Sequence, residues 1–205
     1  MTGRFITLEG GEGAGKSTQL AAIGQWLQQR HQEVVLTREP GGTQLGEAIR
    51  SVLMGTYDAP MPAYSELLLM FAARAAHMEQ VIEPALARGA WVVSDRFTDA
   101  SYAYQGAARQ LGNEAVAVLE QMVQGTRRPD RVLLFDLPVA IGLARRNEDG
   151  EGNRFDHEAL AFHHAVAAAY RARACRHPER YVILDASQSP DIVLTRIKAA
   201  LSPLL

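Results

Sequence analysis

The residues with the clearest chemical meaning form a glycine-rich segment near the start of the chain. Residues 10–17 read Gly-Gly-Glu-Gly-Ala-Gly-Lys-Ser, which fits the phosphate-binding pattern G-x-x-x-x-G-K-[ST]. Glycines let backbone N–H groups turn inward around a polyphosphate, while Lys16 reaches the β and γ oxygens and the Ser17 hydroxyl holds Mg²⁺. The segment therefore predicts a site for a nucleoside triphosphate.

The elements on either side of this segment favour the same interpretation. Residues 5–8 are apolar and β-rich, and residues 18–27 have helical spacing with Leu20, Ile23 and Leu27 on one face. A strand, a glycine loop and a helix in this order place the positive end of the helix dipole against the phosphates.

Strands and helices alternate along the rest of the chain. Further strands are predicted at residues 33–37, 91–94, 132–135 and 181–184, and helices at 45–54, 65–87, 101–110, 114–124, 138–146, 157–176 and 190–201. The strands are short and mostly apolar throughout, which is typical of a parallel sheet covered on both faces. We therefore predict an α/β fold of the P-loop NTPase class. One domain, residues 1–205, has a five-stranded parallel sheet between two layers of helices. Pro84 is expected to kink or divide the helix at 65–87.

Cationic and aromatic residues follow the strands at the end where such sheets bind ligands. The arginines placed there are Arg38, Arg50, Arg74 and Arg96. Guanidinium groups bind phosphate oxygens bidentately, and the rings of Phe71, Tyr102 and Tyr104 lie close by in sequence. This combination favours phosphoryl transfer to a second small molecule over a switch or a pump.

A polar segment at residues 147–153 is interpreted as a small lid. It contains two glycines and is bordered by Arg145, Arg146 and Arg154. Phosphoryl transfer needs a lid that excludes water and cations that neutralise the moving phosphate.

The bulk composition excludes several classes of protein. A net charge of −2 gives no electrostatic reason to expect nucleic acid as a partner. The longest apolar stretch, residues 67–76, is short and interrupted by Arg74, so no membrane span is predicted. The single cysteine, Cys175, and the absence of a recognisable signal peptide predict a cytoplasmic protein. The six histidines lack partners at metal-ligand spacing and are expected on the surface or at helix caps.

Several motifs, taken in order, resemble those of the thymidylate kinase family over nearly the full chain. They are the approach to the phosphate loop at 5–10, Thr-Arg-Glu-Pro-Gly-Gly-Thr at 37–43, Leu-Met-Phe-Ala-Ala-Arg at 69–74, and Asp-Arg-Phe at 95–97 leading to Ala-Tyr-Gln-Gly at 103–106. The segment at 37–43 is the most specific of them. The resemblance implies ATP-dependent phosphorylation of dTMP to dTDP, with Mg²⁺, by a homodimer.

The resemblance also implies roles for individual residues. Lys16 and Arg96 are implied as catalytic residues, and Ser17 as the Mg²⁺ residue, with Asp95 as a further candidate. ATP is assigned to Gly10, Gly11, Glu12, Gly13, Ala14, Gly15, Lys16, Ser17, Thr18 and, near the adenine, Arg145. The acceptor dTMP is assigned to Glu12, Arg38, Glu39, Arg50, Phe71, Arg74, Arg96, Ser101, Tyr104 and Gln105. Among these, Arg74 matches the arginine that hydrogen-bonds thymine, and Phe71 is chosen as the stacking ring.

Two departures from the family pattern leave alternatives open. Gly13 stands where some members carry a catalytic arginine, and the lid interior at 147–153 is acidic where other members have a basic one. The catalytic arginine is therefore predicted at the lid border, at Arg146 or Arg154. The family's stacking residue often lies four positions before the thymine-binding arginine, where this chain has Met70, so the stacking position is Phe71 or shifts by one.

Three other functions compete with this interpretation. A kinase of the same fold acting on another nucleoside monophosphate or on a deoxynucleoside is the nearest, with Glu9 or Asp95 as the base that a nucleoside would require. A guanine-nucleotide switch would need an Asn-Lys-x-Asp motif, and the chain has no Asn-Lys pair. An ATPase that drives a partner protein would leave the arginine and aromatic set without a purpose.

Overall fold

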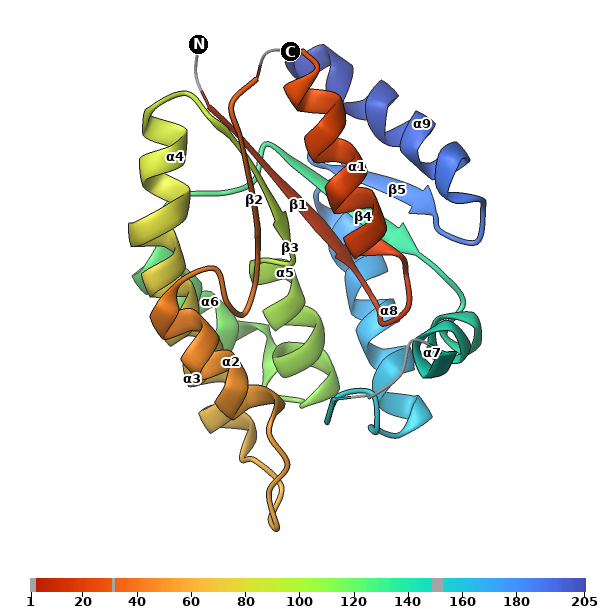
Figure 1. Cartoon of the computed structure of the whole chain (residues 1–205). Coiled ribbons are helices and arrows are strands. Elements are labelled where there is room, and N and C mark those ends of the chain that lie inside the picture. Colours follow the sequence, from red (N-terminus) through yellow and green to blue (C-terminus); the bar gives the residue numbers. More distant parts are fainter. Residues whose placement is uncertain (1–2, 31, 149–152) are drawn as a thin grey trace.

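The centre of the molecule is a sheet of five parallel strands, as the sequence predicts (Figure 1). The computed structural model describes residues 3–30, 32–148 and 153–205. Their strands are β1 (Arg4–Gly10), β2 (Val34–Arg38), β3 (Trp91–Asp95), β4 (Arg131–Asp136) and β5 (Tyr181–Asp185). The order across the sheet is β2-β3-β1-β4-β5, so β1 lies in the middle and the loop that follows it opens at the carboxyl edge of the sheet. Four of the seven lid residues, 149–152, lie outside the described residues.

Helices cover both faces of the sheet because successive side chains of each strand point to opposite sides. Ile6 and Leu8 of β1 pack into a cluster with α1 (Lys16–Gln28) and α9 (Pro190–Leu201). Phe5 points the other way, into a cluster with α4 (Glu83–Ala87). The same second face carries α8 (Leu160–Arg176) against β4. Figure 1 shows α1 and α9 on one side and α8 on the other, which confirms the three-layer prediction.

The edge strands are less covered than the prediction assumed. Leu36 of β2 is 41% exposed and Ile183 of β5 is 52% exposed. Burial on both faces therefore holds for the three central strands and only partly for the two edges.

The helical stretches predicted at 65–87 and 101–110 are each interrupted by a wider, π-helical turn. The first divides into α3 (Ala63–His77), the π-helical η1 (Met78–Ile82) and α4, which carries Pro84 in its first turn. Proline lacks the N–H that a continuous helix needs, so a division at this point was expected. The second begins as α5 (Thr98–Ser101) and continues as the π-helical η2 (Tyr102–Ala108). Such turns occur mostly at functional sites, and η2 carries two of the predicted acceptor-binding residues.

Four further helical elements remain in the described part of the chain. They are α2 (Gln44–Met54), α6 (Gly112–Gln124), α7 (Val139–Glu148) and the 3-10 turn η3 (Ser202–Leu204). Helix α8 begins at Leu160, three residues later than predicted.

Candidate active site

The phosphate loop curls tightly between β1 and α1. Gly13 and Gly15 have φ angles of 66° and 81°, a backbone region that residues other than glycine seldom adopt. A Cβ atom at Gly13 would come within 1.9 Å of the carbonyl oxygen of Gly142 on α7, so the two backbones touch directly. Lys16 Nζ donates to the carbonyl oxygens of Gly10 (3.2 Å) and Gly11 (2.8 Å), which holds the ammonium group inside the loop.

An open cavity of about 520 Å³ faces this loop. Loop residues 12–18 line one side of it, and Arg38, Arg50, Arg145 and Arg146 line the other. Arg145 also borders a neighbouring hollow with Gly15, Thr18 and Gln188, where its Nη1 donates to the carbonyl oxygen of Ala186 at 3.0 Å. The cavity thus combines inward-facing amides with several guanidinium groups, which suits a polyphosphate.

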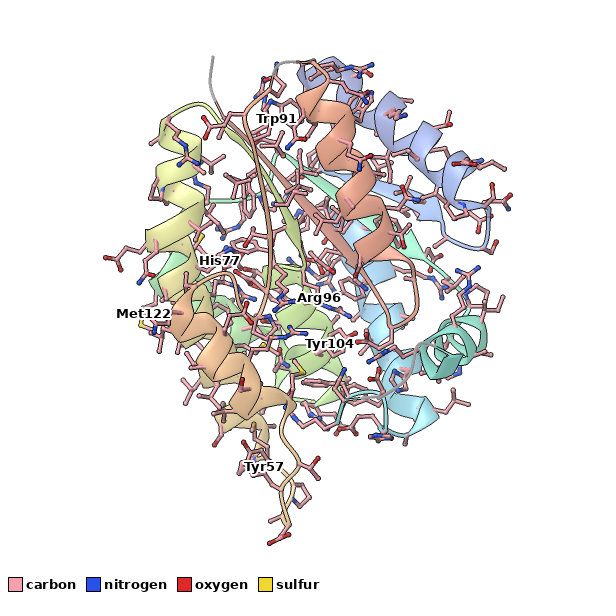
Figure 2. All side chains as sticks on the ribbon, viewed as in Figure 1. Tyr57, His77, Trp91, Arg96, Tyr104 and Met122 are labelled. Carbon is pink, nitrogen blue, oxygen red and sulfur yellow. The ribbon has the colours of Figure 1, made fainter. Side chains whose placement is uncertain are left out.

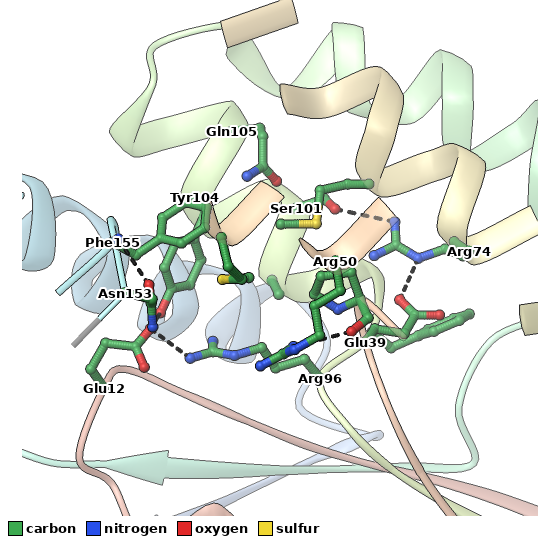
Figure 3. A pocket seen from close by; sticks show the side chains of 15 residues that line it. Glu12, Glu39, Arg50, Arg74, Arg96, Ser101, Tyr104, Gln105, Asn153 and Phe155 are labelled. Carbon is green, nitrogen blue, oxygen red and sulfur yellow. Dashed lines mark hydrogen bonds and ion pairs between the residues drawn. The ribbon is translucent and has the colours of Figure 1, made fainter. Parts of the chain in front are cut away.

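A second pocket lies beside the first, between α3, η2 and the segment after the lid (Figure 3). Its apolar wall consists of Met54, Met70, Phe97, Ala100, Tyr104 and Phe155. Polar groups enter it from Arg74, Ser101 and Gln105. A pocket with apolar and aromatic walls and several polar side chains is suited to a nucleobase with its sugar and phosphate.

A buried chain of polar side chains supports that pocket from below. Arg74 Nε donates to Glu39 Oε2 at 2.7 Å, and Arg74 Nη1 donates to Ser101 Oγ at 3.1 Å. The second oxygen of Glu39 is 2.9 Å from His77 Nδ1, and His77 Nε2 is 2.7 Å from Thr37 Oγ1. His77 and His163 are both buried within helices, so the expectation that they lie on the surface or at helix caps was wrong for these two. The spacing of residues in the sequence does not show which side chains are buried. Only the contacts in the structure show that His77 holds Glu39, which in turn holds Arg74.

The two cavities meet at a shared wall. Glu12, Glu39, Arg50, Arg96 and Asn153 line both of them. Arg96, the residue after β3, belongs to this wall and is labelled in Figure 2. Its φ of 70° is unusual for a residue other than glycine. A strained backbone held in place by its surroundings is typical of functional positions.

Arg96 is held by contacts on every side. Its Nη2 donates to Glu12 Oε1 at 2.8 Å, and its Nη1 donates to the Gly10 carbonyl oxygen at 3.0 Å and to the Tyr170 hydroxyl at 3.3 Å. The Tyr104 hydroxyl donates to the same Glu12 oxygen at 2.6 Å. Burial works against ionisation of Glu12, but Arg96 and Lys16 outweigh it and lower its pKa to about 2. The Glu12 carboxylate and the guanidinium therefore form a fixed ion pair where the two cavities join.

Glu9 lies directly beneath this pair. It accepts from the Phe97 backbone N–H and from the Tyr170 hydroxyl, both at 2.8 Å. Burial, and next the nearby Asp99 carboxylate, raise the pKa of Glu9 to about 8. Burial and the adjacent Arg96 lower the pKa of Lys16. Burial therefore favours the uncharged form of Glu9 and raises its pKa, while Arg96 opposes this.

Two residues with oxygen atoms suited to Mg²⁺, Ser17 and Asp95, line the larger cavity. Asp95 Oδ1 is buried and has no hydrogen-bond partner among the described residues, and the Ser17 hydroxyl lines the same space. Hard oxygen donors of this kind, few in number, match a Mg²⁺ ion that shares its remaining positions with water and phosphate. In the described ranges, no group of three or more His, Cys, Asp or Glu side chains forms a metal site of its own.

Some predicted residues lie elsewhere than expected. Phe71 does not line the acceptor pocket: its ring packs 4.5 Å from the Arg74 guanidinium, and Met70 lines the pocket instead. The flat faces in the pocket wall belong to Phe97, Tyr104 and Phe155. The Tyr102 hydroxyl donates to Glu120, away from the pocket.

The two candidate lid arginines occupy different places. Arg146 lines the phosphate cavity and pairs with Asp156 at 3.2 Å. Arg154 lines neither cavity but a separate hollow with Met61 and Arg109, and its Nη2 donates to Glu66 Oε2 at 2.7 Å. Of the pair, Arg146 is the one whose guanidinium faces the phosphate loop across a cavity.

Sequence reasoning missed several residues of this site. Glu66, Phe97, Phe155 and Tyr170 each contact or line it, and Asn153, predicted only as part of the lid, lines both cavities. Phe97 follows the Asp-Arg pair and was within reach of the motif. Glu66, Phe155 and Tyr170 lie in helices or a loop, where nothing in the pattern separates them from ordinary surface or core residues.

The all-parallel sheet, the phosphate loop and the adjoining pocket for a second molecule define a P-loop kinase of small nucleotides. Comparison with known proteins gives the family. The thymidylate kinase family model matches residues 8–197, so the chain belongs to the thymidylate kinase family. It phosphorylates dTMP to dTDP.

Individual relatives agree over the full length. The chain is 56% identical over 201 residues to a thymidylate kinase of Pseudomonas putida (strain GB-1), covering 98% of this chain and 96% of the relative. It is 55% identical over 205 residues to that of Ectopseudomonas mendocina (strain ymp), covering 100% and 98%. The crystal structure of thymidylate kinase from Ehrlichia chaffeensis superposes with a TM-score of 0.81 at 27% identity, covering 98% of this chain and 100% of that one. No helix among the described residues has the length and apolar character to cross a membrane.

Proposed function

We propose that ATP and dTMP lie end to end across the shared wall of the two cavities and that phosphate passes between them at Arg96. The observation that carries this assignment is the overlap of the two linings at Glu12, Glu39, Arg50 and Arg96. Two reactants held in one continuous cleft react as if at very high local concentration.

In this arrangement the donor binds through the phosphate loop. The loop amides and Lys16 hold the β- and γ-phosphates, and Arg145 lies at the end where adenine would sit, beside Thr18 and Gln188. Ser17 and Asp95 would hold Mg²⁺, which neutralises phosphate charge when it is bound. Support comes from the unpartnered Asp95 oxygen in the same cavity.

The acceptor binds with its base in the second pocket and its phosphate towards Arg96. Arg74 donates to a thymine carbonyl oxygen, and Ser101, Tyr104 and Gln105 surround the base and sugar. Arg50 and Arg96 face the acceptor phosphate, with Arg38 and Glu39 at the side of the cleft. Met70, Phe97 and Phe155 supply the apolar wall in place of Phe71.

The transfer itself needs positioning and charge neutralisation. An oxygen of the acceptor phosphate attacks the γ-phosphorus, the bond between that phosphorus and the bridging oxygen to the β-phosphate breaks, and ADP leaves. The attacking oxygen is already anionic, so no general base is required. Lys16, Arg96 and Arg146 stabilise the charge on the transferred group.

A steady-state assay of ADP release tests the assignment. ADP release is expected to depend on dTMP and to be fastest with dTMP among dUMP, dCMP, dAMP and dGMP. Arg74→Ala is expected to raise the KM for dTMP at least tenfold while the KM for ATP stays within twofold. Release that ignores the acceptor, or a variant in which both KM values rise together, would contradict the two-site arrangement.

We further propose that the enzyme is a cytoplasmic homodimer. Exposed apolar side chains gather on the adjacent helices α3 and α6, namely Tyr64, Leu68, Val118 and Met122. Figure 2 shows Met122 at the outer surface of the molecule. A second copy covering this face would bury them. Sedimentation velocity is expected to give a dimer for the wild type and a monomer for Leu68→Asp; a wild-type monomer at micromolar concentration would reject the proposal.

A further inference from the structure

A fully buried carboxylate stands behind the acceptor pocket and has no part in the reaction as described. Glu66, in the first turn of α3, is 0% exposed. Its Oε1 accepts from Gln105 Nε2 at 2.7 Å, and its Oε2 accepts from Arg154 Nη2 at 2.7 Å and from Arg109 Nε at 3.2 Å. The three donors come from η2, from the residue after it and from the segment after the lid.

These contacts fix which way the Gln105 amide faces. A carboxylate against two guanidinium groups offers only acceptor atoms, so the amide must turn its NH₂ group towards Glu66. The amide oxygen then faces away from Glu66. Gln105 Oε1 is buried and has no hydrogen-bond partner among the described residues, and Gln105 lines the acceptor pocket next to Ser101 and Tyr104 (Figure 3). Buried acceptors are almost always satisfied, so this oxygen points to a donor on the ligand.

We propose that Glu66 is a positioning residue that sets the donor and acceptor pattern at the base end of the acceptor pocket. Arg74 presents N–H donors and Gln105, oriented by Glu66, presents an oxygen. The pocket therefore accepts a base that offers a carbonyl oxygen beside an N–H. Thymine has this pattern at its 4-oxo and N3 positions, and cytosine has the reverse, an amino group beside an unprotonated N3. The inference rests on the proposed placement of the base.

The variant Glu66→Gln removes the fixed polarity with little change in shape. A glutamine at 66 can present its own NH₂ group to Gln105, which frees the Gln105 amide to turn. The equilibrium affinity for dTMP, measured by calorimetry without ATP, is expected to fall about tenfold, or about 1.4 kcal/mol. The ratio of kcat/KM for dTMP over dCMP is expected to fall at least tenfold, and the KM for ATP to stay within twofold.

Glu158→Gln is the matched control. Glu158 also pairs with Arg109, at 2.5 Å, but the structure gives it no contact with Gln105. Loss of an arginine partner alone would therefore affect both variants, whereas loss of amide polarity affects only Glu66→Gln. An equal fall of the dTMP/dCMP ratio in both variants would overturn the inference.

Gln105→Met and the double variant Glu66→Gln/Gln105→Met separate positioning from folding. If Glu66 acts through Gln105, the second substitution adds little to the first, and the losses in the dTMP/dCMP ratio are far from additive. If Glu66→Gln proves unstable by thermal unfolding, Gln105→Met still tests the residue through which Glu66 is inferred to act, since Arg109 and Arg154 keep Glu66 as partner. An unchanged dTMP/dCMP ratio in Gln105→Met overturns the inference. Additive losses also overturn it. A wild-type protein that binds no dTMP would reject the proposed function itself.

Discussion

The ion pair between Glu12 and Arg96 makes the stability of the protein depend on pH in a way that one substitution isolates. The folded pKa of Glu12 is about 2, against an ordinary value of 4.5. The unfolded chain therefore takes up a proton first as pH falls, and the stabilisation present above pH 4.5 is lost as pH falls towards 2. The full shift corresponds to about 3 kcal/mol, of which about 2 kcal/mol is lost by pH 3.

The perturbation is Glu12→Gln, which keeps the shape of the side chain and removes its charge. The free energy of unfolding is measured by urea denaturation of both proteins between pH 6 and pH 3. The wild type is expected to lose about 2 kcal/mol more than the variant over that interval, because only the wild type has the Glu12 carboxylate to protonate. The comparison of slopes holds even if the variant is less stable at every pH.

A surface carboxylate provides the control. Glu33 pairs with Arg88 at 2.7 Å, with both side chains about half exposed, and an exposed pair contributes little. The free energy of unfolding of Glu33→Gln is expected to change with pH as that of the wild type does, within about 0.5 kcal/mol over the same interval. If the Glu12→Gln curve also runs parallel, the ion pair does not hold the Glu12 carboxylate in the way the contacts imply.

Three further predictions concern the neighbouring residues. Arg146→Ala is expected to lower kcat at least tenfold, or about 1.4 kcal/mol of barrier, whereas Arg154→Ala is expected chiefly to raise the KM for dTMP; steady-state kinetics with both substrates varied would expose the reverse assignment. The pKa of Glu9 is raised to about 8, so the stability that it contributes below pH 4.5 is lost as pH rises through 8. Between pH 5 and pH 9 the free energy of unfolding of the wild type is therefore expected to fall relative to that of Glu9→Gln. A difference between the two free energies that stays constant over this interval refutes the prediction. Gly142→Ala places a Cβ 2.4 Å from the Glu12 carbonyl oxygen and is expected to raise the KM for ATP at least fivefold. Gly55→Ala serves as the control. An unchanged KM for ATP in Gly142→Ala would contradict the close contact.

Much of the fold follows from local pattern. The five strands were readable because their apolar runs are short and bounded by charged or glycine residues, as at residues 132–135 before Asp136. The phosphate loop was readable because its chemistry depends on a fixed spacing of glycine, lysine and serine. The π-helical turns could not be predicted from the sequence, since η2 differs from an α-helix only in the pairing of its backbone hydrogen bonds.

The site was predicted where a residue's type reveals its role and missed where contact alone does. Arg74 and Arg96 are cations next to motif residues, so their chemistry was visible. Glu66 lies on a helix whose sequence gives no sign that its carboxylate is buried between two guanidinium groups. The choice between Met70 and Phe71 depended on the rotation of α3 about its axis, which residue spacing does not determine to within one position.

The backbone contact between Gly13 and Gly142 joins the phosphate loop to helix α7. No side chain lies between them, so the phosphate loop and helix α7 pack directly, backbone against backbone. Helix α7 carries Arg145 and Arg146 in its last turn. If a triphosphate shifts the loop when it binds, helix α7 is expected to move with it and to carry Arg145 and Arg146 along.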